Sequence, residues 1–235
     1  MSDVTDDMEP GIPGRNSRSR GHKMGYRALN DADLIEEFVA LDGRDLTLLR
    51  PREADALIDE DAFGADEFIP YWADLWPSAV LLARTIAGRS LRGARVLELG
   101  CGLGLPSLAV ALAGGRALAT DWAPEALDAA RLNATRNELV LDTLVSDWRA
   151  PAELLARGPF DLVIAADVLY ERRNVMPLTE LLTTLETEVW LADPGRPPAA
   201  EMVASLELAG WESSTLAATE RPRVTVHRLQ PGSSS

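Results

Sequence analysis

Short apolar runs alternate with stretches of helical periodicity through most of the chain. Five runs have the length and composition of buried parallel strands: Val96–Leu99, Ala117–Thr120, Leu141–Ser146, Phe160–Ala166 and Val189–Ala192. Helical patterns cover Pro106–Leu112, Glu125–Asn137, Val175–Leu185 and Ala199–Leu208. Trp211–Ala217 and Arg223–Leu229 then indicate two closing strands. This order predicts an α/β fold with a Rossmann-like, doubly wound seven-stranded sheet whose last strand is antiparallel.

Two further apolar runs precede this pattern. Ile35–Leu41 and Leu46–Leu49 flank Asp42-Gly43, a dipeptide typical of a hairpin turn, and a short helix is predicted over Arg52–Ile58. The first 25 residues are polar and lack periodicity, so we expect disorder there. The chain is predicted to consist of a disordered segment at 1–25, one domain at 26–230 and a tail at 231–235. Within the domain we expect an N-terminal β-hairpin extension at 33–50, an aromatic segment with a helix at 70–90 and the core sheet at 94–229.

A glycine-rich loop, Gly100–Gly104, connects the first strand of the predicted sheet to its helix. Strand, glycine loop and helix in this order open a nucleotide-binding βαβ unit, because a Cβ atom would keep the backbone away from a ligand. Glu98 lies two residues before the loop. Its charge would repel a pyrophosphate and attract a ligand that carries an ammonium and a sulfonium, as S-adenosyl-L-methionine does. The alternative is a tight turn beside a surface glutamate.

Carboxylates stand at the ends of four successive strands, at Glu98, Asp121, Asp147 and Asp167. The carboxyl ends of parallel strands meet at one edge of a sheet, where open α/β folds bind ligands. Asp121 follows Gly100 by 21 residues, close to the ~20 at which such folds place an acidic residue that bonds ribose hydroxyls. Each carboxylate alone more often caps a helix. The four together predict a cationic ligand with hydroxyl groups.

Aromatic residues are dense in Ile69–Ser78, where two tryptophans and a tyrosine fall within ten residues. Pro77 suits the first turn of a helix that continues to Ile86. We interpret Trp72 as packing this segment onto the core. Trp76, directly before the helix, fits core packing and a wall of the cofactor pocket equally well.

The net charge of −14 narrows the range of partners. An acidic surface disfavours non-specific binding to nucleic acids and to anionic membranes, so we expect neither as a partner. The same charge is also explained by solubility alone. Hydrophobic and charged contents of 46% and 26% are those of a globular protein.

Few residues could form a metal site or a disulfide. Cys101 is the only cysteine, and His22 and His227 are the only histidines, so we expect no metal, no internal disulfide and no histidine triad. The N-terminus lacks the apolar core of a secretory signal, and the longest apolar stretches are too short to span a bilayer. We therefore expect a cytoplasmic protein, acting as a monomer.

Three stretches resemble the motifs of class I, seven-β-strand methyltransferases that use S-adenosyl-L-methionine. VLELGCGLG (96–104) resembles the first motif, ATDWAPEAL (119–127) the end of the second strand and SDW (146–148) the end of the third. The resemblance implies that residues 26–230 form a methyltransferase domain. Together with the residues above, it predicts a cofactor-binding set of Trp76, Glu98, Gly100, Gly102, Gly104, Asp121, Trp122, Asp147 and Trp148.

Further stretches are similar to the narrower group of family 16 protein lysine methyltransferases, which includes the electron transfer flavoprotein β-subunit lysine methyltransferase and its bacterial relatives. They are PYWADLWPSAVLLA (70–83), DVLY (167–170), ADPGR (192–196) and RVTVHRL (223–229). In this group D-x-x-Y lies at the methyl-transfer end of the pocket, which implies catalytic roles for Asp167 and Tyr170. Ser78-Ala79 departs from the group, because two glycines are expected there.

The resemblance favours methyl transfer to a lysine side chain of a protein. A lysine pKa of ~10.4 lies about three units above neutral pH, so deprotonation costs about 4 to 5 kcal/mol. Asp167 and the Tyr170 hydroxyl are predicted to orient the neutral amine by hydrogen bonds. The alternative for Tyr170 is a buried tyrosine that bonds a backbone group.

Other functions stay open at this point. A small-molecule N-methyltransferase acting on an amine or pyridine metabolite is one alternative, because many such enzymes share the same cofactor-binding part of the fold. A nucleic-acid methyltransferase usually carries Asn/Asp-Pro-Pro-aromatic after the fourth strand, and DVLY has no proline. A catalytically silent cofactor-binding protein would be favoured by a degraded D-x-x-Y pair, and this pair is intact.

Overall fold

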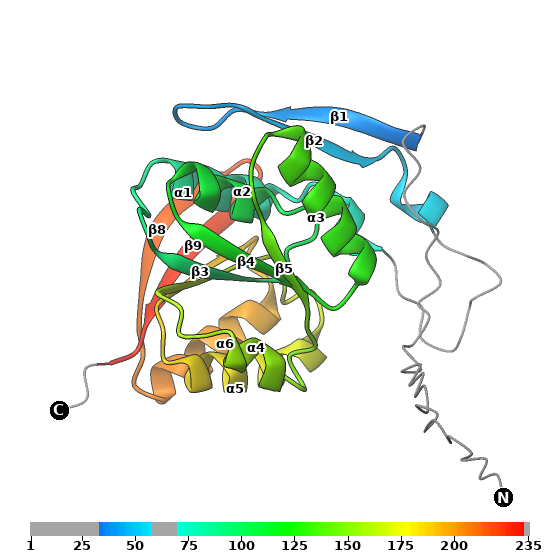
Figure 1. Cartoon of the computed structure of the whole chain (residues 1–235). Coiled ribbons are helices and arrows are strands. Elements are labelled where there is room, and N and C mark those ends of the chain that lie inside the picture. The colour runs from blue at the N-terminus through cyan, green and yellow to red at the C-terminus, as the bar shows by residue number, and fades with distance from the viewer. Residues whose placement is uncertain (1–32, 58–69, 233–235) are drawn as a thin grey trace, which may run out of the picture.

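The computed structural model describes residues 33–57 and 70–232, and a seven-stranded sheet lies at its centre (Figure 1). Its strands, in the order β5-β4-β3-β6-β7-β9-β8, are β3 (Arg95–Leu99), β4 (Arg116–Asp121), β5 (Asp142–Val145), β6 (Leu162–Ala166), β7 (Val189–Asp193), β8 (Glu212–Glu220) and β9 (Arg223–Gln230). β3 to β7 are parallel, and β9 runs antiparallel to both of its neighbours. The predicted fold class is therefore confirmed, including the antiparallel last strand.

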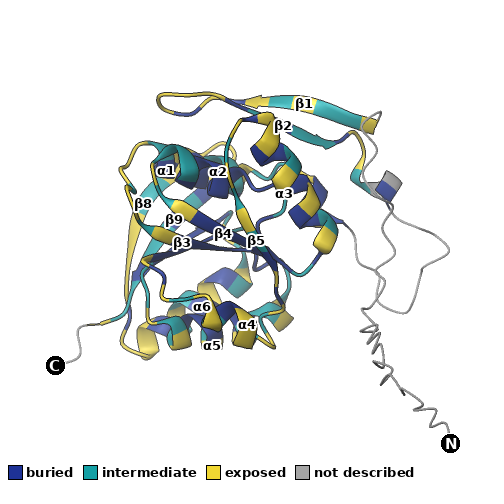
Figure 2. Ribbon diagram, viewed as in Figure 1, coloured by how far each residue is buried: buried dark blue, intermediate teal, exposed yellow. Residues whose placement is uncertain are grey.

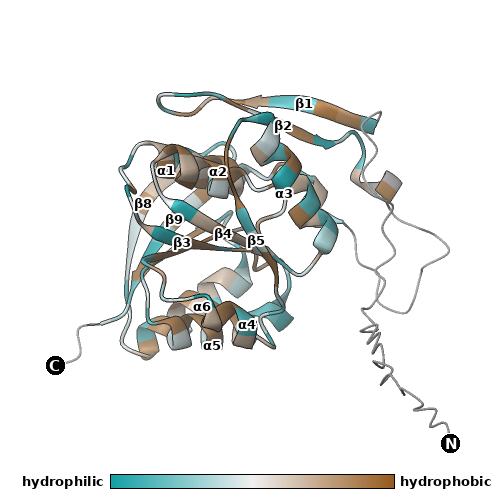
Figure 3. Ribbon diagram, in the orientation of Figure 1, coloured by the Kyte–Doolittle hydropathy of each residue, from teal (hydrophilic) through white to brown (hydrophobic). Residues whose placement is uncertain are grey.

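Helices cover both faces of the sheet (Figure 1). One layer holds α1 (Pro77–Ala87), α2 (Leu105–Leu112) and α3 (Pro124–Arg136), and the other holds α4 (Ala152–Ala156), α5 (Val175–Leu185) and α6 (Pro197–Leu208). Alternate strand residues face opposite layers, since Val96 packs with α1 and α2 while Leu97 packs with α5 and α6. Burial on both sides explains why these strands are continuous apolar runs (Figures 2 and 3).

A separate two-stranded hairpin of β1 (Leu34–Val39) and β2 (Leu46–Pro51) lies over α3 (Figure 1). The strands are antiparallel, and Gly43 in the turn has a φ of +89°, which a residue with a side chain rarely adopts. The predicted hairpin is confirmed. The short helix predicted over Arg52–Ile58 is a 3₁₀ turn, Ala54–Leu57, and Ile58 lies outside the described residues.

Two asparagines, Asn133 on α3 and Asn137 directly after its last residue, attach the hairpin to the domain. The amide of Asn137 accepts from Thr47 N at 2.9 Å and donates to Thr47 O at 2.8 Å, and Asn133 pairs with Leu49 N and O in the same way. Asn133 also donates to the carbonyl of Leu103 in the glycine loop, at 3.0 Å. Residues four apart share one helix face, so the two amides satisfy the edge of β2 as a neighbouring strand would.

Some elements differ from the sequence-based expectations. α4 was not predicted, because five residues are too few to show helical periodicity. Two further 3₁₀ turns, Tyr71–Ala73 and Arg172–Asn174, flank segments that line the site. The predicted disordered segment 1–25 and residues 233–235 of the predicted tail lie outside the described residues. Within the described ranges, no helix is long and apolar enough to cross a membrane.

Candidate active site

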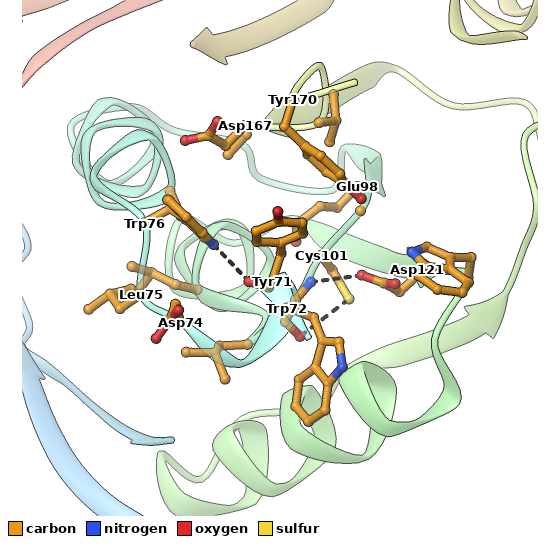
Figure 4. A pocket seen from close by; sticks show the side chains of 18 of the residues that line it. Tyr71, Trp72, Asp74, Leu75, Trp76, Glu98, Cys101, Asp121, Asp167 and Tyr170 are labelled. Atoms are coloured by element: carbon orange, nitrogen blue, oxygen red, sulfur yellow. Dashed lines mark hydrogen bonds between the residues drawn. The ribbon is translucent and has the colours of Figure 1, made fainter. Parts of the chain in front are cut away.

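A cavity of about 300 Å³ opens at the carboxyl ends of β3, β4 and β6 (Figure 4). Such an edge is where open α/β sheets bind their ligands. Of the residues predicted to bind cofactor or to catalyse, those that line it are Trp76, Glu98, Gly100, Gly102, Asp121, Trp122, Trp148, Asp167 and Tyr170. Gly104 and Asp147 do not line this cavity.

The glycine loop lies in a conformation that side chains would prevent. Gly100 has a φ of +65°, and a Cβ atom there would lie 2.8 Å from Val168 Cγ1. Gly104 has a φ of +82° where α2 begins, and its Cβ would lie 2.9 Å from Ala130 Cβ. The geometry therefore gives Gly104 a packing function between α2 and α3. At Gly100 a side chain would collide with Val168, on the loop after β6.

Glu98 is buried at the floor of the cavity, with 1% of its surface exposed. Its carboxylate accepts from Ser107 N at 3.0 Å and from the Ser107 hydroxyl. Burial raises the pKa of Glu98 to about 8, although both hydrogen bonds oppose the shift. The group is therefore largely protonated at neutral pH in the free protein. A cation bound beside it would favour its charged form.

Asp121 connects the end of β4 to the glycine loop (Figure 4). One carboxylate oxygen accepts from Gly102 N and the other from Ala123 N, each at 3.0 Å. Burial raises the pKa of Asp121 to about 6, so the group is mostly ionised at neutral pH. Each oxygen has a second lone pair. Asp121 can thus hold the loop and accept hydrogen bonds from ligand hydroxyls at once.

Asp147 lines a smaller neighbouring cavity of about 100 Å³. Its carboxylate accepts from Arg149 N at 2.9 Å, which fixes the turn after β5. Trp122, Trp148 and Tyr170 line both cavities. The two spaces thus meet at aromatic side chains that could bound a flat ring from either side.

Asp167 follows β6 at the other end of the main cavity, with only 7% of its side chain exposed. Its Oδ1 accepts from Arg196 Nε at 2.8 Å and from Arg196 Nη2 at 2.6 Å, and its Oδ2 accepts from the Ser78 hydroxyl at 3.1 Å. The backbone at Asp167 has a φ of +59°, an uncommon conformation that is concentrated at functional sites. Both oxygens of the predicted catalytic carboxylate are therefore already engaged by the protein.

Three aromatic rings form the wall beside Asp167 (Figure 4). The ring centroids of Tyr71 and Tyr170 are 5.0 Å apart, and those of Tyr71 and Trp76 are 6.2 Å apart. Trp76 Nε1 donates to the carbonyl of Tyr71 at 2.7 Å. Burial raises the pKa of Tyr170 to about 12, so its hydroxyl stays protonated and available as a donor. Tyr71, Trp76, Asp167 and Tyr170 are called the acceptor end below.

Several lining residues were not predicted as site residues, among them Tyr71, Asp74 and Arg196. Arg196 lies within ADPGR and Ser78 within PYWADLWPSAVLLA, two of the stretches that resemble the family. No spacing in the sequence indicates that Ser78 and Arg196 both contact Asp167. In the described part of the chain, no group of three His, Cys, Asp or Glu side chains could hold a metal ion.

Comparison with known proteins identifies the family. A family model described as lysine methyltransferase matches residues 72–191, just over half of the chain. The chain belongs to this lysine methyltransferase family. The glycine loop and the buried carboxylates fit a cofactor that carries positive charge and hydroxyl groups, as S-adenosylmethionine does.

Two relatives and one solved structure illustrate the likeness. The chain is 35% identical to the electron transfer flavoprotein beta subunit lysine methyltransferase of Xenopus laevis over 54% of this chain and 53% of that protein. It is 34% identical to the histone-arginine methyltransferase METTL23 of Homo sapiens over 41% of this chain and 54% of that protein. A 16S rRNA methyltransferase from T. thermophilus, solved with AdoMet and guanosine, has a TM-score of 0.58 at 15% identity, covering 84% of this chain and 50% of that one, and thus shares the fold. The match spans about half the length of these two relatives.

Proposed function

We propose that the chain methylates the side-chain amine of a protein lysine. The observation that carries this proposal is the acceptor end, where the Asp167 carboxylate and the Tyr170 hydroxyl line the same cavity as the glycine loop, with the rings of Tyr71 and Trp76 beside them. Aromatic rings exclude water and suit a narrow aliphatic chain that ends in an amine. The lysine methyltransferase named above among the relatives supports the same choice.

The residues around the glycine loop are proposed to hold the cofactor. The loop amides and Glu98 would surround its amino-acid portion, Asp121 would accept from its ribose hydroxyls, and Trp122 and Trp148 would bound its adenine ring. When bound, S-adenosylmethionine supplies an electrophilic methyl group on a sulfonium. The protein's own task is then to position a neutral nucleophile in line with that methyl group.

The Tyr170 hydroxyl and the remaining lone pair of Asp167 Oδ2 are proposed to orient the acceptor amine. Tyr170 and Asp167 both line the cavity, and both follow β6, three residues apart in the chain. An amine hydrogen donated to Asp167 directs the nitrogen lone pair away from the carboxylate. When the direction of the lone pair is fixed, the amine nitrogen is held in line with the methyl group before the reaction, which lowers the entropic part of the barrier.

A labelling experiment tests this proposal. The protein is incubated with methyl-labelled S-adenosylmethionine and a lysate, and labelled proteins are separated from small molecules and hydrolysed to amino acids. We expect the label in methylated lysine. The Asp167→Asn variant is the matched negative control, and Asp128→Asn, which removes only a surface ion pair with Arg131, is the positive control.

Each of the other results identifies a different reaction. Label in methylated arginine would overturn the choice of lysine in favour of the reaction named for the histone-arginine relative. Label confined to small molecules would indicate the metabolite N-methyltransferase, and label in nucleic acid would overturn the protein substrate altogether.

A further inference from the structure

The ion pair between Asp167 and Arg196 is the strongest electrostatic feature of the acceptor end. Arg196 lines the cavity with 33% of its side chain exposed, and two of its N–H groups converge on Asp167 Oδ1. The two residues lie 29 positions apart, on the loops that follow β6 and β7. The pair is therefore made by the fold, at the point where an acceptor would enter.

The loop that carries Arg196 is itself held in place. Asp193, at the end of β7, accepts from Gly195 N and Arg196 N, each at 2.6 Å. Arg196 is also the residue directly before α6, so its backbone is fixed by the start of that helix. A guanidinium that is anchored at both its backbone and its charged end is a built component of the site.

The charge of this pair matters because the nucleophile has to be a neutral amine. A lone carboxylate beside an alkylammonium stabilises the protonated, unreactive form, whereas a paired carboxylate has its charge cancelled. The paired carboxylate keeps one lone pair, on Oδ2, and can still accept one hydrogen bond from the amine. Charge is thus removed while orientation is kept.

We propose that Arg196 is a positioning residue that cancels the charge of Asp167 and thereby lets the acceptor amine lose its proton in the site. The proposal rests on the proposed N-methylation. Arg196 acts through Asp167 and need not touch the substrate. Its absence should make the site bind alkylammonium more tightly and methylate it more slowly at neutral pH.

The other charged and titratable groups around the acceptor end are the same in the parent and in the Arg196 variant, so their own titration cancels when the two pH profiles are compared. They are Tyr71 and Asp74 before α1, Glu98 and Asp121 near the ends of β3 and β4, Tyr170 and Glu171 after β6, and Asp193 at the end of β7. Most of the ionisable ones are acidic. This makes Arg196 the one cationic side chain that lines the cavity among the described residues, and so the one group there that opposes the ammonium form.

The test measures how methylation depends on pH in Arg196→Gln. In single-turnover reactions on an acceptor found by the labelling experiment, the acid limb of the rate should move to higher pH by about one unit. The rate at pH 7 should therefore fall about tenfold and recover at high pH, while KM for the acceptor falls. In Arg196→Lys the acid limb of the rate should stay at the same pH as in the parent, because the substitution keeps the positive charge. Arg157→Gln, which removes a surface ion pair with Glu153, is the control.

The charge-balanced double variant Asp167→Asn/Arg196→Gln separates charge from structure. It leaves no unpaired charge, so its acid limb should return to the parent position even if its maximum rate is lower. If it stays shifted, or if Arg196→Gln slows the reaction equally at every pH, Arg196 is only structural and the proposal is wrong. The double variant also carries the test if Arg196→Gln alone does not fold.

A binding measurement keeps the proposal independent of the natural substrate. n-Butylamine is titrated calorimetrically at pH 9 into protein saturated with S-adenosylhomocysteine, in buffers of different ionisation enthalpy. Because the parent is proposed to favour the neutral amine, n-butylammonium should release more protons when it binds to the parent than when it binds to Arg196→Gln. Equal release overturns the proposal alone, with N-methylation intact. If the parent neither binds n-butylamine nor methylates any amine, N-methylation and this proposal both fail.

Discussion

The two halves of the active site are constructed in different ways. Around the cofactor, contacts are short in sequence and use backbone donors, as in Ser107 N to Glu98 and Gly102 N to Asp121, over separations of 9 and 19 residues. At the acceptor end, contacts join side chains over 89 residues, from Ser78 to Asp167, and over 29, from Arg196 to Asp167. The glycine loop and its two carboxylates are thus carried by one βαβ unit, whereas the acceptor end is assembled by the tertiary structure.

This difference has a consequence for substitutions. Backbone donors persist when neighbouring side chains change, so the cofactor half tolerates sequence variation outside its glycines and carboxylates. Side-chain pairs change whenever either partner changes. We therefore expect the acceptor end to be the part of the fold that sets which amine is methylated, and the following experiments separate the two halves.

The largest effect is expected for Asp167→Asn. The substitution removes the ion pair and leaves the Arg196 guanidinium without its carboxylate. Methyl transfer in a single turnover should fall by ~100-fold or more, the range for losing a positioned group. Cofactor affinity, measured by calorimetry, should stay within a few-fold. A parent-like rate would make Asp167 structural and would leave the cofactor half unaffected.

Asp121→Ala should produce the opposite pattern. It removes the acceptor of two backbone N–H groups and of the proposed ribose hydrogen bonds, so S-adenosylmethionine binding should weaken by about 2 to 3 kcal/mol. Asp142→Ala, at the exposed start of β5, is the control. The comparison between the halves would be wrong if Asp121→Ala bound cofactor normally and lost only the transfer rate.

The pH dependence of cofactor binding examines Glu98. Because burial raises its pKa to about 8, the free protein carries a proton there at pH 6, and a bound cation favours its release. Affinity for S-adenosylmethionine should therefore rise between pH 6 and 7.5, by up to about tenfold per unit. S-adenosylhomocysteine, which lacks the sulfonium charge, should show a shallower rise.

Glu98→Gln is the control for that titration. An amide keeps the shape and does not titrate, so the affinity should rise less steeply with pH than in the parent, and what rise remains comes from groups such as Asp121. The cofactor-free protein should also change in stability. A folded pKa above the unfolded value means that the parent loses free energy of unfolding as pH rises from about 4.5 to 8, so Glu98→Gln should melt higher than the parent at pH 8.

The smallest effect is expected for Tyr170→Phe. The ring contact with Tyr71 survives and only the hydroxyl is lost. Single-turnover transfer should fall by about tenfold, the value of one hydrogen bond that aligns the amine. A loss as large as that of Asp167→Asn would move the main orienting function from the carboxylate to the tyrosine. An unchanged rate would support the alternative of a structural tyrosine.

The cofactor half could be predicted from the sequence because its signals are local. Apolar runs, glycines and strand-end carboxylates stand at fixed spacings, and parallel pairing brings their ends to one edge. Gly104 and Asp147 do not line the main cavity, because Gly104 lies at the start of α2 and Asp147 lines the neighbouring cavity. Spacing alone shows which residues approach the edge, and packing decides which of them line the cavity.

The sequence by itself determined the order of strands and helices, the glycine loop and the edge at which the carboxylates gather, since each depends on periodicity or on near neighbours. Only the tertiary structure decided that Arg196 and Ser78 meet Asp167, and that Asn133 and Asn137 hold the hairpin. It also decided the protonation of Glu98. Those outcomes depend on distances and burial between segments far apart in the chain, which no local pattern encodes.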